Sequence, residues 1–261
     1  MKWLDGRELA DFIKERQRQV VAEMDQKPKL LIIRDSDHPV IKKYVHLKCA
    51  YGEDIGVEVI DRKAEDLETL MTAIRQANQD SEITGIIVQL PLKNPKWTEQ
   101  VVNEIDAKKD VDGLSGKGRF DSATATAINW LLAGHGVNLE NKKIAVVGRG
   151  WLVGRPLIKM WRESGLMVEE FGRDGDLGRL FEFEIVVTAT GVPHLIQSEM
   201  IRGGAVVVDA GTASEDGMIV GDVDEKVRKR KDLTALTPKV GGVGPLTVAV
   251  LFEQVIAVKN N

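Results

Sequence analysis

The fold class is decided by the stretch Ile144-Ala-Val-Val-Gly148-Arg149-Gly150-Trp-Leu-Val-Gly154-Arg155-Pro156. Four apolar residues run into a glycine-rich turn, and a helical pattern follows. Glycines permit a tight turn and let a phosphate approach the backbone, while the start of the next helix offers free N–H groups to it. The spacing G-x-G-x-x-x-G is one residue longer than the usual dinucleotide fingerprint. We predict a nucleotide-binding loop here, against the simpler alternative of a strand-to-helix turn without a ligand.

Further short apolar runs lie on both sides of this stretch, at residues 30–33, 56–60, 85–88, 168–171, 185–188 and 205–208. Most are uniformly apolar, which indicates strands buried on both faces of a parallel sheet. Helical spacing of apolar residues separates them, at 9–24, 67–77, 123–132, 153–161 and 246–258. Strand alternating with helix predicts a doubly wound α/β protein.

The length of 261 residues suits two domains of ordinary size. Residues 110–122 are rich in Gly, Asp, Ser and Lys, and the strands after them arrive at the spacing of a nucleotide-binding fold. We therefore place the domain boundary in this segment. The short helix that follows is expected to cross between the domains.

Charge and composition exclude several classes of function. The net charge is −4, and the basic run 226–231 is expected to be a solvated helix end, so no nucleic-acid partner is predicted. The single cysteine, Cys49, and four scattered histidines show no metal-ligand spacing, so no metal is predicted. The polar start does not resemble a signal peptide, and no apolar run approaches the roughly 20 residues of a membrane helix. We expect a cytoplasmic protein without a membrane partner.

Two arginines bear on the choice of cofactor. Arg149 follows the first strand of the nucleotide-binding pattern, and Arg173 follows the second. Guanidinium groups match the oxygens of a phosphate, so both could hold the 2′-phosphate of NADP. Asp174 could bind a ribose diol instead. The pattern favours NADP and leaves NAD open, and Arg173 alone could equally be an exposed turn residue.

The first half of the chain carries three candidate polar groups. Tyr44 and Lys48 stand four residues apart and would share one face of a helix, where a lysine with a lowered pKa could move protons. On spacing alone, an exposed amphipathic helix face is the better explanation of this pair. Gln89 ends a buried strand, where α/β folds place ligands. Asp112 lies in an acidic turn that could also be a plain Asx-turn.

Taken together, the motifs resemble the bifunctional methylenetetrahydrofolate dehydrogenase/cyclohydrolase (FolD) family. The resemblance runs nearly from end to end. It rests on motifs in a fixed order, which are Leu4-Asp-Gly6, Tyr44-x-x-x-Lys48, Val88-Gln-Leu-Pro-Leu92, Lys109-Asp-Val-Asp-Gly113, Val147 to Pro156, Val208-Asp-Ala-Gly211, Gly221-Asp-Val223 and Gly241-Gly-Val-Gly-Pro-Leu-Thr247.

The resemblance implies a fold and an assembly. It predicts a three-layer folate-binding catalytic domain at residues 1–121 plus 245–261, a linker helix at 122–134, and a Rossmann-like NADP-binding domain at 135–244. Folate would lie in a cleft between the domains, and the protein would be a homodimer.

The resemblance also implies residue roles. Lys48 matches the catalytic lysine, Gln89 the glutamine that tunes it, Tyr44 the tyrosine that stacks on folate, and Asp112 the acid that grips the pterin edge. Gly244 and Pro245 would add to the folate site. The cofactor would contact the residues Gly148, Arg149, Gly150, Gly154, Arg173, Gly191, Gly211 and Thr212, with the nicotinamide near the last three.

The implied reaction oxidises 5,10-methylenetetrahydrofolate with NADP to the 5,10-methenyl cation. Hydrolysis of that cation then gives 10-formyltetrahydrofolate, with Lys48 handling protons. Two alternatives remain open. One is another NAD(P)-dependent dehydrogenase on a similar scaffold, of the amino-acid or shikimate type. The other is a folate-binding protein that has lost catalysis, against which the retained Lys48 argues.

The sequence departs from the family pattern at four places. Ile41 stands where the family has serine, and Gly150 replaces a serine of the nucleotide loop. Ser122-Ala-Thr-Ala125 replaces Pro-Cys-Thr-Pro, and Thr237-Pro-Lys-Val-Gly-Gly242 replaces Thr-Pro-Val-Pro-Gly-Gly. The loop between 113 and 122 is also shorter than usual. Since all four catalytic candidates are retained, we expect both activities, and cofactor affinity is the property most exposed to these changes.

Overall fold

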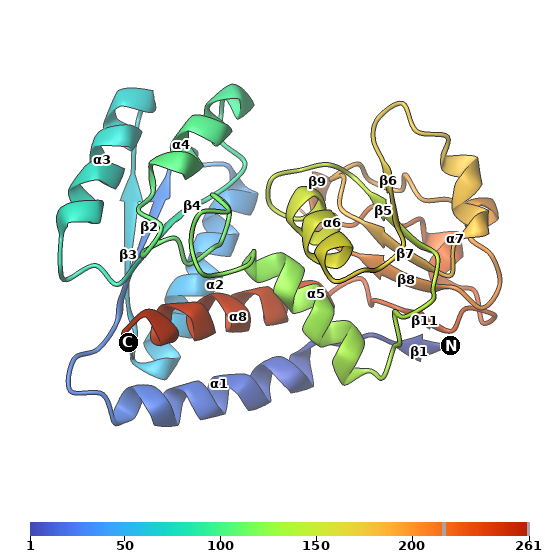
Figure 1. Cartoon of the computed structure of the whole chain (residues 1–261), viewed down its shortest axis with the longest axis horizontal. Coiled ribbons are helices and arrows are strands. Elements are labelled where there is room, and N and C mark those ends of the chain that lie inside the picture. The colour runs from blue at the N-terminus through green and yellow to red at the C-terminus, as the bar shows by residue number, and fades with distance from the viewer. Residues whose placement is uncertain (216–217, 260–261) are drawn as a thin grey trace. The chain divides into compact units, whose positions relative to one another are not determined.

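The computed structural model describes residues 1–215 and 218–259. Its contacts divide the chain into two compact units (Figure 1). The six-stranded unit comprises Met1–Ala10 and Thr124–Thr247, and the three-stranded unit comprises Asp11–Ala123 and Val248–Asn261. The boundaries fall within helix α1 (Arg7–Ala22), at the start of α5 (Ala123–Gly134) and within α8 (Val243–Lys259).

The three-stranded unit is built on a parallel sheet in the order β3-β2-β4. Its strands are β2 (Lys29–Arg34), β3 (Glu58–Lys63) and β4 (Gly85–Val88), and its helices are α2 (Pro39–Ile55), α3 (Leu67–Gln79), the 3-10 turn η1 (Pro95–Trp97) and α4 (Thr98–Glu104). The central strand β2 and β4 are buried, whereas the edge strand β3 is largely exposed. Burial on both faces explains why β2 and β4 read as continuous apolar runs in the sequence.

Helices cover both faces of this sheet. Val59 of β3 lies against Gly52 of α2, whereas the next residue, Ile60, lines a groove with Gln76 and Ala77 of α3. Successive strand residues point to opposite faces, so α2 and α3 lie on opposite sides of the sheet. The unit therefore has the three layers that the sequence predicted.

The six-stranded unit is a parallel sheet in the order β1-β11-β8-β7-β5-β6. The strands are β1 (Lys2–Trp3), β5 (Ile144–Val147), β6 (Val168–Phe171), β7 (Ile185–Thr188), β8 (Val206–Asp209) and β11 (Ala235–Leu236). Between them lie α6 (Gly154–Glu163), α7 (Glu225–Arg228), the 3-10 turns η2 (Leu177–Glu182) and η3 (Ser198–Met200), and the antiparallel pair β9 (Ala213–Glu215) and β10 (Met218–Val220).

The order of these strands reverses at β5. The chain places β6 on one side of β5 and then β7 on the other side. In doubly wound sheets the ligand binds beyond the carboxyl ends of the strands at such a switch point. The glycine turn after Val147 leaves β5 at this position. The doubly wound α/β class predicted from the sequence is confirmed.

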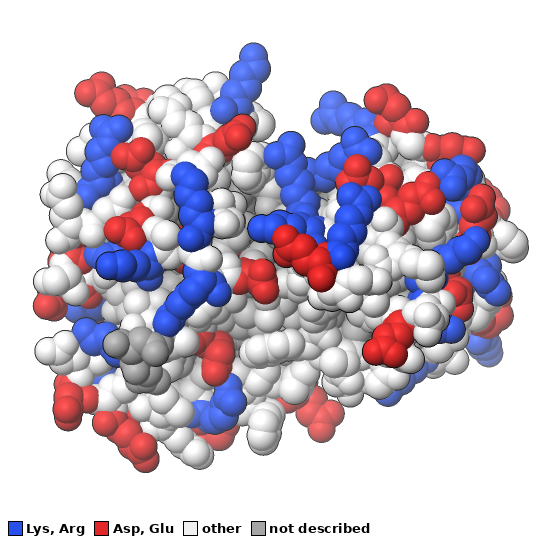
Figure 2. Space-filling model, viewed as in Figure 1, with Lys and Arg blue, Asp and Glu red and all other residues white. Residues whose placement is uncertain are grey.

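One prediction from the charge pattern was only partly right. The basic run 226–231 is only partly a solvated helix end, because the side chain of Arg228 is 8% exposed and paired with Asp209. The exposed members of the run, such as Lys226 and Lys229, fit the prediction. On the face shown in Figure 2, basic and acidic side chains are interspersed.

Two kinds of feature are absent from the described residues. No helix there is long and apolar enough to cross a membrane. Over the same part of the chain, His, Cys, Asp and Glu form no group of three or more that could hold a metal ion.

Candidate functional site

Helix α2 carries the Tyr44 and Lys48 side chains. It begins at Pro39, whose ring fixes a helical φ, and His38 caps it by accepting the N–H of Val40 at 3.4 Å. Tyr44 is half-buried, and Lys48 is only 9% exposed. The alternative of an exposed amphipathic face was therefore wrong for Lys48. A buried ammonium requires polar partners, and these come from other elements.

Gln89 supplies the first partner. It follows β4, and its backbone N–H donates to the carbonyl of Ile33 at 2.8 Å, which extends the sheet by one residue. Its side-chain Nε2 donates to the carbonyl of Leu90 at 3.0 Å. This contact turns Oε1 toward Lys48, whose Nζ donates to it at 2.7 Å. The amide orientation is thus fixed by the backbone, and the ammonium is held by a neutral oxygen.

Asp112 comes from a loop that a different aspartate organises. Asp110 pairs with Ile86 in a parallel bridge, and its carboxylate accepts the N–H of Gly113 at 3.0 Å and the hydroxyl of Ser115 at 2.6 Å. Gly113 has φ +67, and a Cβ there would lie 2.4 Å from the carbonyl of Asp121. Asp110 therefore makes the Asx-type turn, and Asp112 is held separately, at 8% exposure.

Burial shifts the proton affinities of both ionisable groups. It lowers the pKa of Lys48 below the ordinary lysine value, and attraction to Asp112 opposes that shift. It raises the pKa of Asp112 to about 6, and Lys48 opposes that shift in turn. An amine and a carboxyl group brought toward neutrality in this way suit proton transfer near pH 7.

The nucleotide loop of the six-stranded unit is closely packed at two of its glycines. Gly148 has φ +109, and a Cβ there would lie 2.5 Å from the carbonyl oxygen of Ala189. A Cβ at Gly154 would lie 2.0 Å from the carbonyl oxygen of Gly148. Gly150 faces open space. Helix α6 begins at Gly154 without a side-chain cap. The N–H of Arg155 donates to the carbonyl of Gly150 at 3.1 Å, and Pro156 has no N–H, so the start of this helix offers few N–H groups to an anion.

Arg149 lies at the end of β6. Its guanidinium packs against Gly172, 3.3 Å from the point where a Cβ would stand, and it pairs with Glu170 at 3.3 Å. Arg173 and Asp174 are both exposed in the following turn. The structure therefore holds Arg149 at the end of β6 and leaves Arg173 exposed in the turn that follows.

The turns after β7 and β8 bring the remaining cofactor candidates together. Gly191 has φ +69, and a Cβ there would lie 3.4 Å from the carbonyl oxygen of Thr212. Gly211 precedes Thr212 in the second turn, and both turns follow buried strands of the same sheet. One edge of the six-stranded sheet is therefore lined by Gly191, Gly211 and Thr212.

Gly244 and Pro245 lie in the first turn of α8. Gly244 is exposed and Pro245 is half-buried. Both belong to the six-stranded unit, whereas Tyr44, Lys48, Gln89 and Asp112 belong to the three-stranded one. Their assignment to a folate site stays a prediction.

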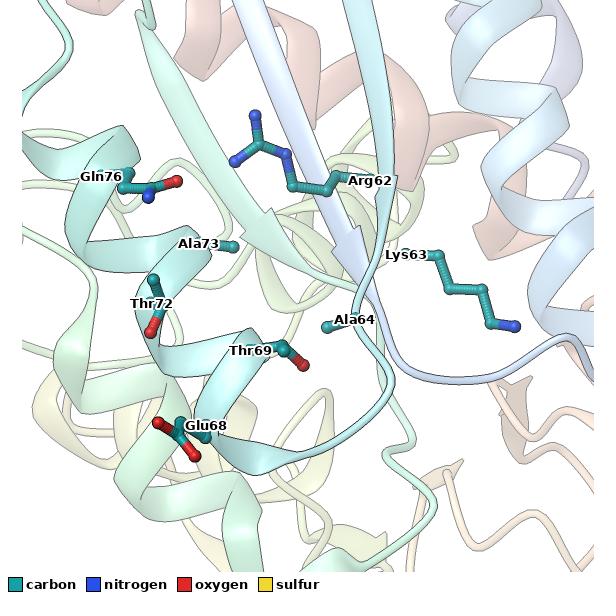
Figure 3. Close-up of a pocket in the computed structure, with 8 residues that line it drawn as sticks. All are labelled: Arg62, Lys63, Ala64, Glu68, Thr69, Thr72, Ala73 and Gln76. Atoms are coloured by element: carbon teal, nitrogen blue, oxygen red, sulfur yellow. The ribbon is translucent and has the colours of Figure 1, made fainter.

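A groove of about 300 Å³ opens elsewhere on the three-stranded unit (Figure 3). It lies between the end of β3 and α3, and its lining residues are Arg62, Lys63, Ala64, Glu68, Thr69, Thr72, Ala73 and Gln76. None of the predicted site residues lines it, so it is separate from the Lys48 cluster.

Comparison with known proteins agrees with this geometry. A family model described as "Tetrahydrofolate dehydrogenase/cyclohydrolase, catalytic domain" matches residues 4–112, and its "NAD(P)-binding domain" counterpart matches residues 122–261. The chain belongs to the tetrahydrofolate dehydrogenase/cyclohydrolase family. The resemblance predicted from the motifs is thereby confirmed, and with it the class of bifunctional enzyme.

Similar proteins cover nearly the whole chain. The "Bifunctional protein FolD" of Hydrogenobaculum sp. is 34% identical over 97% of this chain and 96% of its own length. The crystal structure of the FolD enzyme from Campylobacter jejuni matches with a TM-score of 0.90 at 30% identity, covering 100% of this chain and 99% of that one. The FolD structure from Trypanosoma brucei, complexed with NADP cofactor and inhibitor, matches with a TM-score of 0.89 at 28% identity over 98% and 96%.

Family membership removes one open alternative, and the structure accommodates two of the departures from the family pattern. A dehydrogenase of the amino-acid or shikimate type would not match both domains of the tetrahydrofolate dehydrogenase/cyclohydrolase family. Ile41, which replaces the family's serine, is 4% exposed and packs in the core. Gly150, which replaces the nucleotide-loop serine, has room for a side chain. Neither change displaces Lys48.

A buried polar cluster that the sequence did not predict lies beneath the turns that carry Gly191 and Gly211. Asp209, at the end of β8, pairs with Arg228 of α7, and Asp222 is fully buried beside it. The motifs around Asp209 and Asp222 were visible in the sequence, but nothing local to residues 226–231 indicated that one arginine of the run is buried. The pairing depends on packing between segments about twenty residues apart.

Proposed function

We propose that this protein oxidises 5,10-methylenetetrahydrofolate to the 5,10-methenyl cation with NADP and hydrolyses that cation to 10-formyltetrahydrofolate. The observation that carries the proposal is the buried pair of Lys48 and Gln89 beside Asp112, in a chain whose two parts match the two domains of this family. A binding protein without catalysis would have no need of a buried lysine with a lowered pKa.

The substrate would be held by the three-stranded unit. Tyr44, half-buried on the same face of α2 as Lys48, offers a flat ring on which the pterin can stack. Asp112 offers a carboxylate to the N–H donors of the pterin edge. Both groups fix the orientation of the bridging carbon, which is the main requirement for hydride transfer.

Lys48 would manage protons in the hydrolytic step. Water adds to the methenyl carbon, and one proton leaves the adding water. The bond from that carbon to one of its two nitrogens then breaks, as the new hydroxyl on the carbon loses its proton and becomes the formyl C=O. The released nitrogen gains a proton, and the formyl group remains on the other nitrogen. The net reaction consumes one water and releases one proton. The Lys48 Nζ, oriented by Gln89, is the group that accepts and returns the transferred proton.

The six-stranded unit would bind the nicotinamide cofactor, which supplies the hydride acceptor when bound. The glycine turn at 148, 150 and 154 suits close approach of the pyrophosphate to the backbone, and Gly191, Gly211 and Thr212 suit the nicotinamide end. Arg149 at the end of β6 favours NADP over NAD, with Arg173 as a second contact. Glu170 competes for Arg149, so NAD remains a usable substitute.

The two units thus take separate tasks. Residues 1–121 with 245–261 would form the folate-binding catalytic domain, 122–134 a linker helix and 135–244 the cofactor domain. The contact division, which assigns residues 1–10 to the six-stranded unit, differs from this scheme at its margins. We also propose a homodimer, which sedimentation of the full chain would test.

A spectroscopic assay tests the proposal. The protein is incubated with 5,10-methylenetetrahydrofolate and either NADP or NAD, and reduced nicotinamide and the methenyl cation are followed together. We expect faster reduction with NADP and little accumulation of the methenyl cation. Absence of reduction with both cofactors would contradict the dehydrogenase assignment.

A further inference from the structure

Two buried carboxylates lie beneath the turns that carry Gly191 and Gly211. The Oδ2 atom of Asp222 accepts the hydroxyl of Thr188 at 2.6 Å and the backbone N–H of Thr190 at 2.7 Å. Its buried Oδ1 atom has no hydrogen-bond partner among the residues that the structure describes. A Cβ on Gly211 would lie 2.0 Å from that oxygen. Asp222 therefore touches both turns at once.

Asp209 fixes Asp222 from the other side. Its carboxylate accepts the backbone N–H groups of Gly211 at 3.1 Å, Asp222 at 3.0 Å and Val223 at 3.1 Å, and it pairs with Arg228. Burial raises the pKa of Asp209, and Arg228 and the N–H donors oppose that shift. Asp209 also packs against Gly221, where a Cβ would lie 2.1 Å from the Oδ2 atom of Asp209.

The charges of this cluster do not balance. Among the described residues, Arg228 pairs with Asp209 and not with Asp222, so the two carboxylates and one guanidinium carry one net negative charge. All the hydrogen bonds to Asp222 come from neutral donors. Asp222 is 0% exposed and the side chain of Asp209 is 3% exposed, so water screens this charge poorly.

We propose that Asp222 is a positioning residue whose unbalanced negative charge makes the six-stranded unit bind the oxidised, cationic nicotinamide in preference to the reduced, neutral one. The inference rests on the proposed placement of the nicotinamide at Gly191 and Gly211. A positive ring beside a buried anion is stabilised, whereas an uncharged ring gains nothing. The charge thereby favours loading of the oxidised cofactor and release of the reduced product.

Equilibrium binding tests this assignment. Dissociation constants for NADP⁺ and NADPH are measured by calorimetry for the wild-type protein and for Asp222→Asn. The asparagine keeps the shape and one acceptor oxygen for Thr190 but removes the charge. We expect the dissociation constant for NADP⁺ to rise about tenfold while that for NADPH changes less than about twofold.

A matched control separates charge from structure. Thr188→Val removes one donor to Asp222 and leaves the charge and the Thr190 contact. It should leave the ratio of the two dissociation constants at the wild-type value. If Asp222→Asn does not fold, Asp222→Ser offers a smaller neutral acceptor for the same comparison.

The outcomes distinguish two failures. A wild-type protein that binds neither nucleotide would contradict the proposed cofactor site itself. A wild-type protein that binds both, with Asp222→Asn weakening NADP⁺ and NADPH equally, would overturn the charge assignment and leave Asp222 a purely structural residue.

Discussion

A lysine ammonium is seldom buried without an anion in direct contact, yet Lys48 donates to the neutral oxygen of Gln89. Asp112 influences its charge electrostatically, from a loop that Asp110 has already shaped. A neutral partner leaves the amine easier to deprotonate than a carboxylate partner would. The surroundings of Lys48 therefore favour loss of the proton from its ammonium group.

Substitutions of Gln89 should shift the proton affinity of Lys48 in opposite directions. Gln89→Leu removes the acceptor and should lower the pKa of Lys48 further, whereas Gln89→Glu adds an opposite charge and should raise it. The pH profile of kcat/KM for methenyl hydrolysis should move correspondingly. Identical profiles for all three proteins would contradict the role of Gln89.

Asp112 should govern the acidic side of the folate-dependent activity. Its pKa of about 6 means that the carboxylate needed for the pterin N–H donors is lost as the pH falls below 6. We expect kcat/KM for the wild type to fall there, and Asp112→Asn to be less active at pH 7 but flat across this range. An unchanged acidic limb in the variant would assign it to another group.

The raised pKa of Asp112 also makes the free energy of unfolding depend on pH. The folded-state pKa of Asp112 is raised from 3.8, so its contribution to stability is complete below pH 3.8 and is lost as the pH rises through about 6. The unfolding free energy of the wild type relative to Asp112→Asn should therefore decrease between pH 4 and pH 7.

At the scale of elements, local patterns predicted what depends on local periodicity. The strands β2, β4, β5, β7 and β8 stand close to their predicted ranges, because burial on both faces leaves a continuous apolar run. The strands β1 and β11 have two residues each, too short for any period to show. Helix α2 was foreseen only around Tyr44 and Lys48, since its exposed lysines weaken the apolar stripe.

In the candidate site, too, the sequence predicted the features that depend on local patterns. Candidates at strand ends and on one helix turn were visible, whereas the burial of Lys48 and the pairing of Asp209 with Arg228 depend on contacts between distant segments. The resemblance supplied the roles that spacing alone left open. Contacts between residues far apart in the sequence are therefore the part of the site that local sequence patterns did not predict.

The nucleotide loop allows a matched pair of glycine substitutions. Gly154→Ala places a methyl group 2.0 Å from the carbonyl oxygen of Gly148, so the backbone must move, at a cost of about 1–3 kcal/mol and with weaker NADP binding. Gly150→Ser enters open space and adds a hydroxyl near the expected phosphate, so NADP should bind as well or better. Titration with NADP compares them. Equal affinities would place the phosphate elsewhere.

At the scale of the whole molecule, the division into two units predicts where each ligand protects the chain. NADP alone should slow amide exchange around residues 148–154, 189–191 and 210–212 of the six-stranded unit, and should leave the sheet of the three-stranded unit unchanged. Exchange mass spectrometry resolves these segments. Protection centred on residues 29–112 would contradict the assignment of the cofactor to the six-stranded unit.

The central claim is that Lys48 performs the hydrolytic half of a two-step reaction. Its most direct test is Lys48→Met in the assay that follows NADPH and the methenyl cation together, with Lys43→Met, on the exposed face of the same helix, as the control. We predict at least about a 100-fold loss of methenyl hydrolysis with accumulation of the cation in Lys48→Met, and wild-type behaviour in the control. Hydrolysis at the wild-type rate in a folded Lys48→Met protein would contradict the account.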